Sequence, residues 1–364
     1  MPKKKQIHYN MDNIISKDCL WNMIIGERSN GKSYQVKHKR GIEKYLATGK
    51  RFVYLRRFKE EIKSSTVEAY FQDVDISKLT EGKYNTVQYW RNRIYFGNYD
   101  QETNKIKRGE FFAYTMSLNQ EQNYAGGSYL DVEDIIYEEF MSRSIYLAHE
   151  PDKLSNLYST IDRKRGKVKV WMIGNVISRA CPYLVEWEVL PEVVRMKQGD
   201  ILTKEIPIDE DHKITVAIEY TGHIEGGSSY VMGKHSAMIN NGMWQSDPQP
   251  KLPKSKKEYD ILFRCKFIYH TFQFLGEVLR DRETRNKIWF IYPKTRFSEK
   301  SKDILTFSDI INVSKYYNID PYHCKIRNKK VLEYCDMFTE DNIFYSDDLT
   351  GTEFKNVINF SISR

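Results

Sequence analysis

The chain has few cysteines and no long apolar segment. Its 364 residues include five cysteines, which are scattered and form no C-x-x-C pair. This spacing argues against a zinc site and a disulfide framework, and it suits a reducing compartment. No apolar run approaches the roughly 18 to 20 residues that a membrane span needs, and the basic N-terminus lacks the apolar segment of a signal peptide. We therefore expect a cytoplasmic protein with no membrane partner.

The charge balance and the length set further bounds. There are 57 Lys and Arg residues against 49 Asp and Glu, a net charge of +8, which is compatible with nucleic-acid contact but is weak evidence for it alone. The length suits two domains. A spacer rich in proline and lysine, residues 246–257, marks a boundary between them. We expect one domain at residues 1–205, a linker module at 206–255 and a second domain at 256–364.

The most informative stretch has the spacing G-x-x-x-x-G-K-S, which is the phosphate-binding P-loop pattern. An apolar run, residues 20–25, precedes it, and helix formers follow over residues 33–46, so a strand–loop–helix unit is expected. Its backbone N–H groups would surround phosphates, Lys32 would reach the β- and γ-phosphates, and Ser33 would bind Mg²⁺. The alternative is an ordinary glycine-rich turn. The predicted ATP-binding residues here are Gly26, Glu27, Arg28, Ser29, Asn30, Gly31, Lys32 and Ser33.

A second motif consists of an apolar strand that ends in two acids. Residues 135–137 are apolar, and Glu138 and Glu139 follow. This matches the Walker B arrangement, in which the first acid supports the metal and the second orients and deprotonates the attacking water. Glu138 stands where aspartate is usual and is one methylene longer, so its role is open. A nucleotide-binding scaffold without catalysis is the alternative. Small-molecule kinases share P-loops, but paired acids favour hydrolysis.

Several basic and polar residues follow predicted strands or helices. A strand over residues 51–57 ends in two arginines, which would face either nucleotide, a neighbouring subunit or solvent. A helix over 151–161 ends in a basic cluster, and the strand over 168–173 ends at Asn175, a candidate sensor of the γ-phosphate. Strands at 87–97 and 109–118 would form a hairpin around a polar turn, residues 98–108. The turn contains the candidate DNA contacts Lys105, Lys107 and Arg108.

Five segments together resemble the DNA-packaging (encapsidation) ATPases of phi29-like small tailed bacteriophages. They are IIGERSNGKSYQVK, FVYLRRFK, IIYEEF, NLYSTIDRKRGKV and GNVIS, in the order and spacing of that family. The family is a P-loop translocase of the additional-strand, catalytic-glutamate class, related to the FtsK/HerA translocases. The resemblance implies a ring, typically a pentamer, that docks on the portal vertex of a prohead in the host cytoplasm. There it would hydrolyse ATP with Mg²⁺ to drive double-stranded DNA inward, in some members on a scaffold RNA.

The resemblance also implies a role for individual residues. Lys32 and Ser33 would bind phosphate and Mg²⁺, Glu138 would take the metal position, and Glu139 would be the catalytic base. The basic helix end would supply an arginine finger to the next subunit's nucleotide, from either Arg163 or Arg165, with Arg163 favoured. Asn175 would be the sensor, and Arg56 and Lys59 would belong to a lid or coupling region at the nucleotide.

The implied fold class is α/β. It comprises a P-loop ATPase domain with a mainly parallel sheet flanked by helices, a small linker module and a C-terminal α/β RNase H-like domain. In the family this last domain has lost its nuclease site. The first predicted strand here, 263–275, carries no acid in its middle, and Glu277 and Asp281 have no obvious partner. We expect nucleic-acid or motor contact from this domain. The alternatives are a terminase-type motor with an active nuclease and a related FtsK/HerA-like DNA pump.

Overall fold

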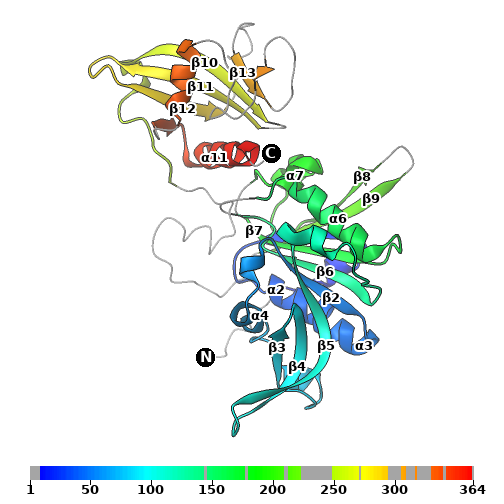
Figure 1. The fold of residues 1–364 in the computed structure, drawn as a ribbon. Coiled ribbons are helices and arrows are strands. Elements are labelled where there is room, and N and C mark those ends of the chain that lie inside the picture. The colour runs from blue at the N-terminus through cyan, green and yellow to red at the C-terminus, as the bar shows by residue number, and fades with distance from the viewer. Residues whose placement is uncertain are drawn as a thin grey trace, which may run out of the picture. The chain divides into compact units, whose positions relative to one another are not determined.

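The computed structural model describes most of the chain as two compact units (Figure 1). The first unit comprises Met1–Ser142, His149–Ile177 and Glu186–Met243, and the second comprises Arg143–Ala148, Ser178–Val185 and Trp244–Arg364. No helix within the described part is long and apolar enough to cross a membrane. The described residues are 9–142, 146–176, 179–208, 212–222, 248–269, 272–293, 305–308, 316–317, 329–338 and 342–362.

The first unit is built on a nine-stranded sheet in the order β3-β4-β5-β2-β6-β7-β1-β9-β8. The six central strands, in the order β5, β2, β6, β7, β1 and β9, are parallel to one another. Strands β4 and β3 extend one edge of the sheet and β8 extends the other, each antiparallel to its neighbour. Strand β7 lies between β1 and β6. It is the additional strand that the resemblance implies. The strands are β1 (Trp21–Gly26), β2 (Arg51–Arg56), β3 (Thr86–Trp90), β4 (Arg93–Asp100), β5 (Lys105–Ser117), β6 (Val132–Glu138), β7 (Lys169–Asn175), β8 (Ile201–Pro207) and β9 (Lys213–Tyr220).

Helices cover both faces of this sheet. Successive side chains of β1 point to opposite faces, and all six residues of β1 are buried, so both faces must be covered. Ile24 packs in one core cluster with Val36 and Ile42 of the helical segment that follows the P-loop. Trp21, on the opposite face, packs against Tyr158 of α6. The helices are α1 (Asp12–Ile15), α2 (Lys32–Val36), the π-helix η1 (Lys37–Glu43), α3 (Lys44–Thr48), η2 (Lys59–Glu61), α4 (Ser64–Tyr70), α5 (Ile76–Leu79), η3 (Leu118–Tyr124), α6 (Glu150–Asp162) and α8 (Leu190–Arg195). Helix α7 (Pro182–Glu186) belongs, except for its last residue, to the second unit.

Two predictions for this unit are wrong. The boundary at residue 205 cuts through β8, because β8 pairs with β9 and β9 pairs in parallel with β1. The nine-stranded sheet therefore continues to Tyr220, inside the predicted linker module. The strand predicted at 87–97 is two strands, β3 and β4, that meet at a turn of two left-handed residues, Arg91 and Asn92. Lys105, Lys107 and Arg108 consequently lie in β5 rather than in a turn.

The second unit is a six-stranded sheet in the order β14-β13-β10-β11-β12-β15. Strands β10, β11 and β12 are antiparallel, while β13 runs parallel to β10 and β14 parallel to β13. The stretch predicted as one strand, 263–275, is divided between β10 and β11. Phe354 of α11 packs on Phe267 and Phe274 of the sheet. The elements are η4 (Lys256–Glu258), β10 (Tyr259–Tyr269), β11 (Phe272–Asp281), β12 (Lys287–Pro293), β13 (Leu305–Ser308), β14 (Tyr316–Tyr317), α10 (Lys329–Asp336), β15 (Ile343–Tyr345) and α11 (Asp348–Ile362).

Candidate active site

The predicted phosphate loop connects the carboxyl end of β1 to the start of α2. Gly31 has φ of 93°, a left-handed conformation that favours glycine, and it directly precedes the first residue of α2, Lys32. Gly26 is required for a different reason, since a Cβ atom there would lie 1.8 Å from Thr221 Oγ1. The loop therefore adopts the tight strand-to-helix turn that the spacing predicts, with Ser33 in the first turn of the helix.

Hydrogen bonds from residues outside the sequence motifs fix the conformation of the loop. The buried Asn30 side chain donates from Nδ2 to Thr221 Oγ1 at 2.6 Å, and its Oδ1 accepts from Lys32 Nζ at 3.1 Å. The Asn30 carbonyl accepts from the Tyr9 amide at 3.1 Å. The Tyr9 hydroxyl in turn donates to Glu219 Oε2 at 2.5 Å. Segments at both ends of the unit's sequence thus fix the loop.

Glu219 gives the first unit a testable pH dependence. Burial raises the pKa of this carboxyl to about 7, against an ordinary value of 4.5. The folded state therefore keeps a proton that the unfolded chain loses between these pH values, so the free energy of unfolding falls as the pH rises through this window. The expected loss is on the order of 3 kcal/mol. Glu219→Gln, which is neutral throughout, should lose less stability between pH 4.5 and 8.

Chemical unfolding followed by tryptophan fluorescence at pH 4.5 and pH 8 measures this difference. The glutamine keeps an oxygen that accepts the Tyr9 hydroxyl, so the two proteins are matched in hydrogen bonding. An identical pH dependence in both would refute a buried, proton-binding Glu219.

Lys32 is buried and already faces acceptor oxygens. Its Nζ donates to the Glu27 carbonyl, to Asn30 Oδ1 at 3.1 Å and to Asn175 Oδ1 at 3.5 Å. Burial lowers the pKa of the ammonium to about 8, against 10.5, and the charges of Glu138 and Glu27 oppose this shift. A phosphate group supplies the strong negative charge that such a desolvated ammonium favours.

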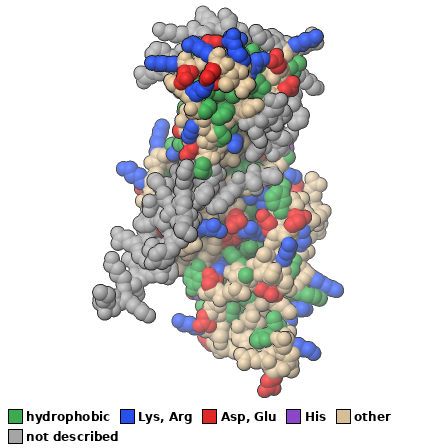
Figure 2. Space-filling model, turned by 90° about the vertical axis from the view of Figure 1, so that its left-hand side faces the viewer, with side chains coloured by type: hydrophobic (Ala, Val, Ile, Leu, Met, Phe, Trp, Pro, Cys, Tyr) green, Lys and Arg blue, Asp and Glu red, His purple; other side chains and the backbone are tan. Residues whose placement is uncertain are grey.

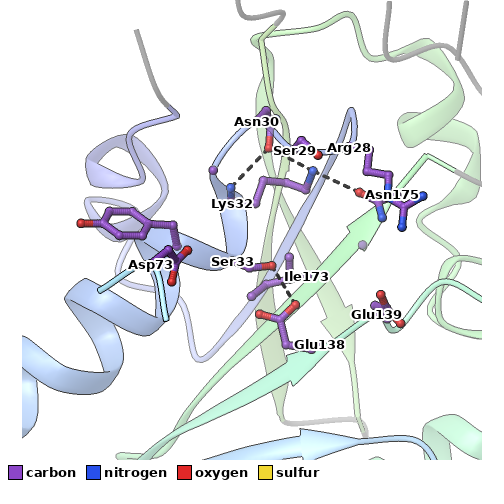
Figure 3. A pocket seen from close by; sticks show the side chains of 13 residues that line it. Arg28, Ser29, Asn30, Lys32, Ser33, Asp73, Glu138, Glu139, Ile173 and Asn175 are labelled. Atoms are coloured by element: carbon purple, nitrogen blue, oxygen red, sulfur yellow. Dashed lines mark hydrogen bonds between the residues drawn. The ribbon is translucent and has the colours of Figure 1, made fainter. Parts of the chain in front are cut away.

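Glu138 occupies the end of β6 and faces the P-loop helix (Figure 3). Its Oε2 accepts from Ser33 Oγ at 2.8 Å, and its Oε1 accepts from Tyr70 OH at 2.6 Å. Burial raises the pKa of this carboxyl, whereas the two hydroxyl donors lower it. A hydroxyl and a carboxylate side by side are the oxygen donors that Mg²⁺ takes in nucleotide sites, so these residues fit that ion.

Glu139, the next residue, points elsewhere because its backbone is left-handed, with φ of 57°. Its side chain is 60% exposed, and Oε2 accepts from Arg56 Nη2 at 2.9 Å. Arg57 fixes the backbone at this point, because its guanidinium donates to the carbonyls of Glu139 and Phe140 and pairs with the buried Glu150. Consecutive acids thus have different environments, one buried beside the P-loop and one accessible to water.

These side chains surround one cavity of about 310 Å³. It brings together most of the predicted site, including Asn175 at the end of β7, and it adds Tyr34 and Asp73, which the motifs did not indicate. Arg56 does not line the cavity, but it donates to Glu139, which does. Lys59 does not line the cavity and donates instead to Asn92 Oδ1 at 2.5 Å. The lining residues are Arg28, Ser29, Asn30, Gly31, Lys32, Ser33, Tyr34, Asp73, Glu138, Glu139, Ile173, Gly174 and Asn175.

The two candidates for the arginine finger, Arg163 and Arg165, differ in how many hydrogen bonds they donate within the chain. Arg165 donates to five backbone carbonyls, those of Tyr129, Leu130, Val132, Ile161 and Asp162. Arg163 is exposed and donates to the carbonyl of Gly127. It follows α6 and precedes β7, whose seven residues then run about 20 Å to the cavity. Neither arginine lines the cavity of its own chain.

Comparison with known proteins identifies one matching family, similar sequences and a similar fold. The model of the podovirus DNA encapsidation protein (Gp16) family matches residues 3–325. The DNA packaging protein of Bacillus phage phi29 is 26% identical over 277 residues, and that of Bacillus phage PZA is 27% identical over the same length, each match covering 74% of both chains. A chain of the phi29 viral genome packaging motor assembly has the same fold, with a TM-score of 0.53, 20% identity and coverage of 96% of this chain and 99% of that one. The chain belongs to the family of podovirus DNA encapsidation proteins.

Proposed function

We propose that this protein is the ATP-hydrolysing subunit of a ring that drives double-stranded DNA into a viral prohead. The observation that carries the proposal is the joining of two motifs at one cavity. Lys32 and Ser33 of the P-loop face Glu138 and Glu139, and Ser33 is hydrogen-bonded to Glu138. The relatives are DNA packaging proteins, which supplies the DNA and the prohead of the proposal.

Each residue would have a separate part in hydrolysis. Lys32 would hold the β- and γ-phosphates, while Ser33 and Glu138 would hold Mg²⁺, which supplies charge neutralisation at the phosphates when bound. Glu139 would accept the proton of the attacking water, and its exposure to solvent supports that assignment. Asn175, beside Lys32, would sense the γ-phosphate.

The ring and its arginine finger are the finer part of the proposal. Arg163 lies about the length of β7 from the cavity of its own chain, and its side chain is exposed. The Arg165 guanidinium instead donates its hydrogen bonds to backbone carbonyls. A finger from Arg163 would therefore act on the nucleotide of a neighbouring copy. A closed ring of five copies at the portal, with or without a scaffold RNA, would place one such site at every interface.

The packaging reaction itself tests the proposal. Proheads, linear DNA and this protein should give nuclease-resistant DNA with ATP and none with a non-hydrolysable analogue. Protection that does not depend on hydrolysis would contradict a motor.

Two arginines beside Trp90 support DNA contact by the first unit. Arg91 and Arg108 lie over the same half-exposed indole, with Cζ 4.4 and 4.0 Å from the centroid of the Trp90 ring. Among the described residues neither arginine forms an ion pair. On the face of the molecule that Figure 2 shows, basic and acidic side chains intermingle. Two unpaired cations on one ring favour a bound anion, for which the DNA backbone is our candidate.

Replacing both arginines by alanine should weaken DNA binding at all sequences alike. Loss of two phosphate contacts should reduce the slope of log K against log salt by about 2. The matched control replaces Lys83 and Lys213 by alanine, two exposed lysines that already pair with Glu110 and Glu205. Fluorescence anisotropy of labelled duplex at several salt concentrations measures both. An equal slope in the two double variants would remove this contact from the account.

The second unit is proposed to be RNase H-like and inactive as a nuclease. In support, strands β10 to β14 follow the order 3-2-1-4-5 when counted from β10, with the first three antiparallel, and β15 is added in parallel beside β12. Glu277 is buried and accepts from Arg264 Nε at 3.0 Å and Tyr292 OH at 3.0 Å, and it pairs with Lys256. Two cations thus already pair with this buried acid, which makes it less available to metal ions. Plasmid cleavage with Mg²⁺ or Mn²⁺ would instead favour a terminase-type nuclease.

A further inference from the structure

The Glu138 carboxylate has a second anchor from outside the nucleotide motifs. Tyr70 is the last residue of α4, and its hydroxyl donates to Glu138 Oε1, while Ser33 occupies Oε2. Glu138 is only 5% exposed, so its hydrogen bonds to the protein decide how the carboxylate lies. A tyrosine at this place has no part in the P-loop or in the acid motif.

Tyr70 is itself fixed by the helix that follows the phosphate loop. Lys37, at the start of the π-helical segment, is buried, and its Nζ donates to the Tyr70 carbonyl and pairs with Asp73. The same Nζ lies 4.6 Å from the centroid of the Tyr70 ring. The ring also packs on Tyr54 of β2, at 4.7 Å between centroids. The hydroxyl therefore has little freedom to leave Glu138.

A glutamate needs such an anchor more than an aspartate does. Its side chain has one more rotatable bond, and it reaches one methylene farther, so a single hydroxyl contact leaves more conformations open. Outer hydrogen bonds commonly orient metal-binding carboxylates. Here the extra length and the extra donor occur together.

We propose that Tyr70 is a positioning residue, whose hydroxyl holds the longer Glu138 carboxylate against Ser33 and the Mg²⁺-phosphate position. The proposal rests on the proposed ATP hydrolysis. It extends the site to α4, and through the bond from the Tyr89 amide to Glu68 Oε1 at 3.1 Å it connects the site to the edge strand β3.

Tyr70→Phe removes the hydroxyl and keeps the packing. The full-length variant should need about 10- to 100-fold more Mg²⁺ for half-maximal binding of a fluorescent ATP analogue, and kcat should fall in the same range. Binding of the analogue in EDTA should be unchanged. Tyr54→Phe is the matched control, because no hydrogen bond among the described residues joins Tyr54 to Glu138, and it should keep the Mg²⁺ requirement of the wild type.

A second variant guards against a folding defect. Glu138→Asp shortens the acid, so it should lose the contact with Tyr70, and adding Tyr70→Phe to it should change the Mg²⁺ requirement little further. An unchanged Mg²⁺ requirement in Tyr70→Phe, an equal rise in Tyr54→Phe, or full additivity with Glu138→Asp would each overturn the proposal. If the wild type neither binds the analogue nor hydrolyses ATP, the proposed function fails instead.

Discussion

Glu139→Gln should abolish most ATP turnover while leaving ATP binding intact. A general base contributes about 10² to 10⁴ in rate, and glutamine keeps the shape but cannot accept the proton. The carboxylate lines the cavity, is accessible to water, and is held by Arg56 at 2.9 Å. Turnover by phosphate release and affinity by a fluorescent ATP analogue separate the two effects.

Glu61→Gln is the matched control for this variant. Glu61 Oε2 also accepts from Arg56, from Nε at 3.2 Å, but Glu61 does not line the cavity. Both substitutions remove one carboxylate from the same guanidinium, but only Glu139 lines the cavity. Equal turnover in the two variants would mean that Glu139 is not the base and would favour a scaffold that binds nucleotide without hydrolysing it.

Arg163→Ala should have the second large effect. An arginine finger contributes about 10³ to 10⁵ in rate by stabilising charge on the transferring phosphoryl group. The site of each chain keeps Lys32, Ser33 and both glutamates, so ATP affinity should stay within about twofold of the wild type. Steady-state hydrolysis under assembly conditions measures the loss.

Lys167→Ala provides the comparison for Arg163→Ala. Lys167 is exposed and follows Arg163 closely in sequence, and its backbone amide donates to Asp162 Oδ1 at 3.0 Å, a contact that alanine keeps. Removing its side chain changes the local charge by the same amount. A similar loss in both variants would point to general electrostatics rather than to a finger.

The sequence contained much of this site because its signals are local. The P-loop spacing and the apolar strand that ends at Glu138 and Glu139 each occupy fewer than about ten residues, and strand–turn–helix chemistry acts over that range. The strand at Asn175 and the helix before Arg163 were found for the same reason. Parallel strands then place these ends at one edge of the sheet.

The supporting residues were not predictable because their contacts span long separations in sequence. Thr221 holds Asn30 from 191 residues away, and Tyr70 reaches Glu138 across 68 residues. No periodicity indicates such pairs. The predicted domain boundary at 205 is wrong because β8 and β9 extend the sheet beside β1, a pairing that only the assembled fold determines.

Local signals also failed where the chain departs from common turn chemistry. Arg91 and Asn92 form the β3–β4 turn with φ of 47° and 59°, without the glycine that usually marks such a turn. The sequence there reads as one continuous strand. The division between β10 and β11 is not predictable either, because both strands lie within one long run of aromatic and β-branched residues.

The central claim is that one chain's nucleotide is hydrolysed with help from the next. The direct measurement is ATP turnover per wild-type chain, in dilute wild-type protein, as excess Glu139→Gln chains are added. These chains lack the base but carry Arg163, so turnover per wild-type chain should rise. Chains that combine Glu139→Gln with Arg163→Ala should give no rise. Turnover that stays the same at every protein concentration, with and without added chains, would contradict hydrolysis at subunit interfaces.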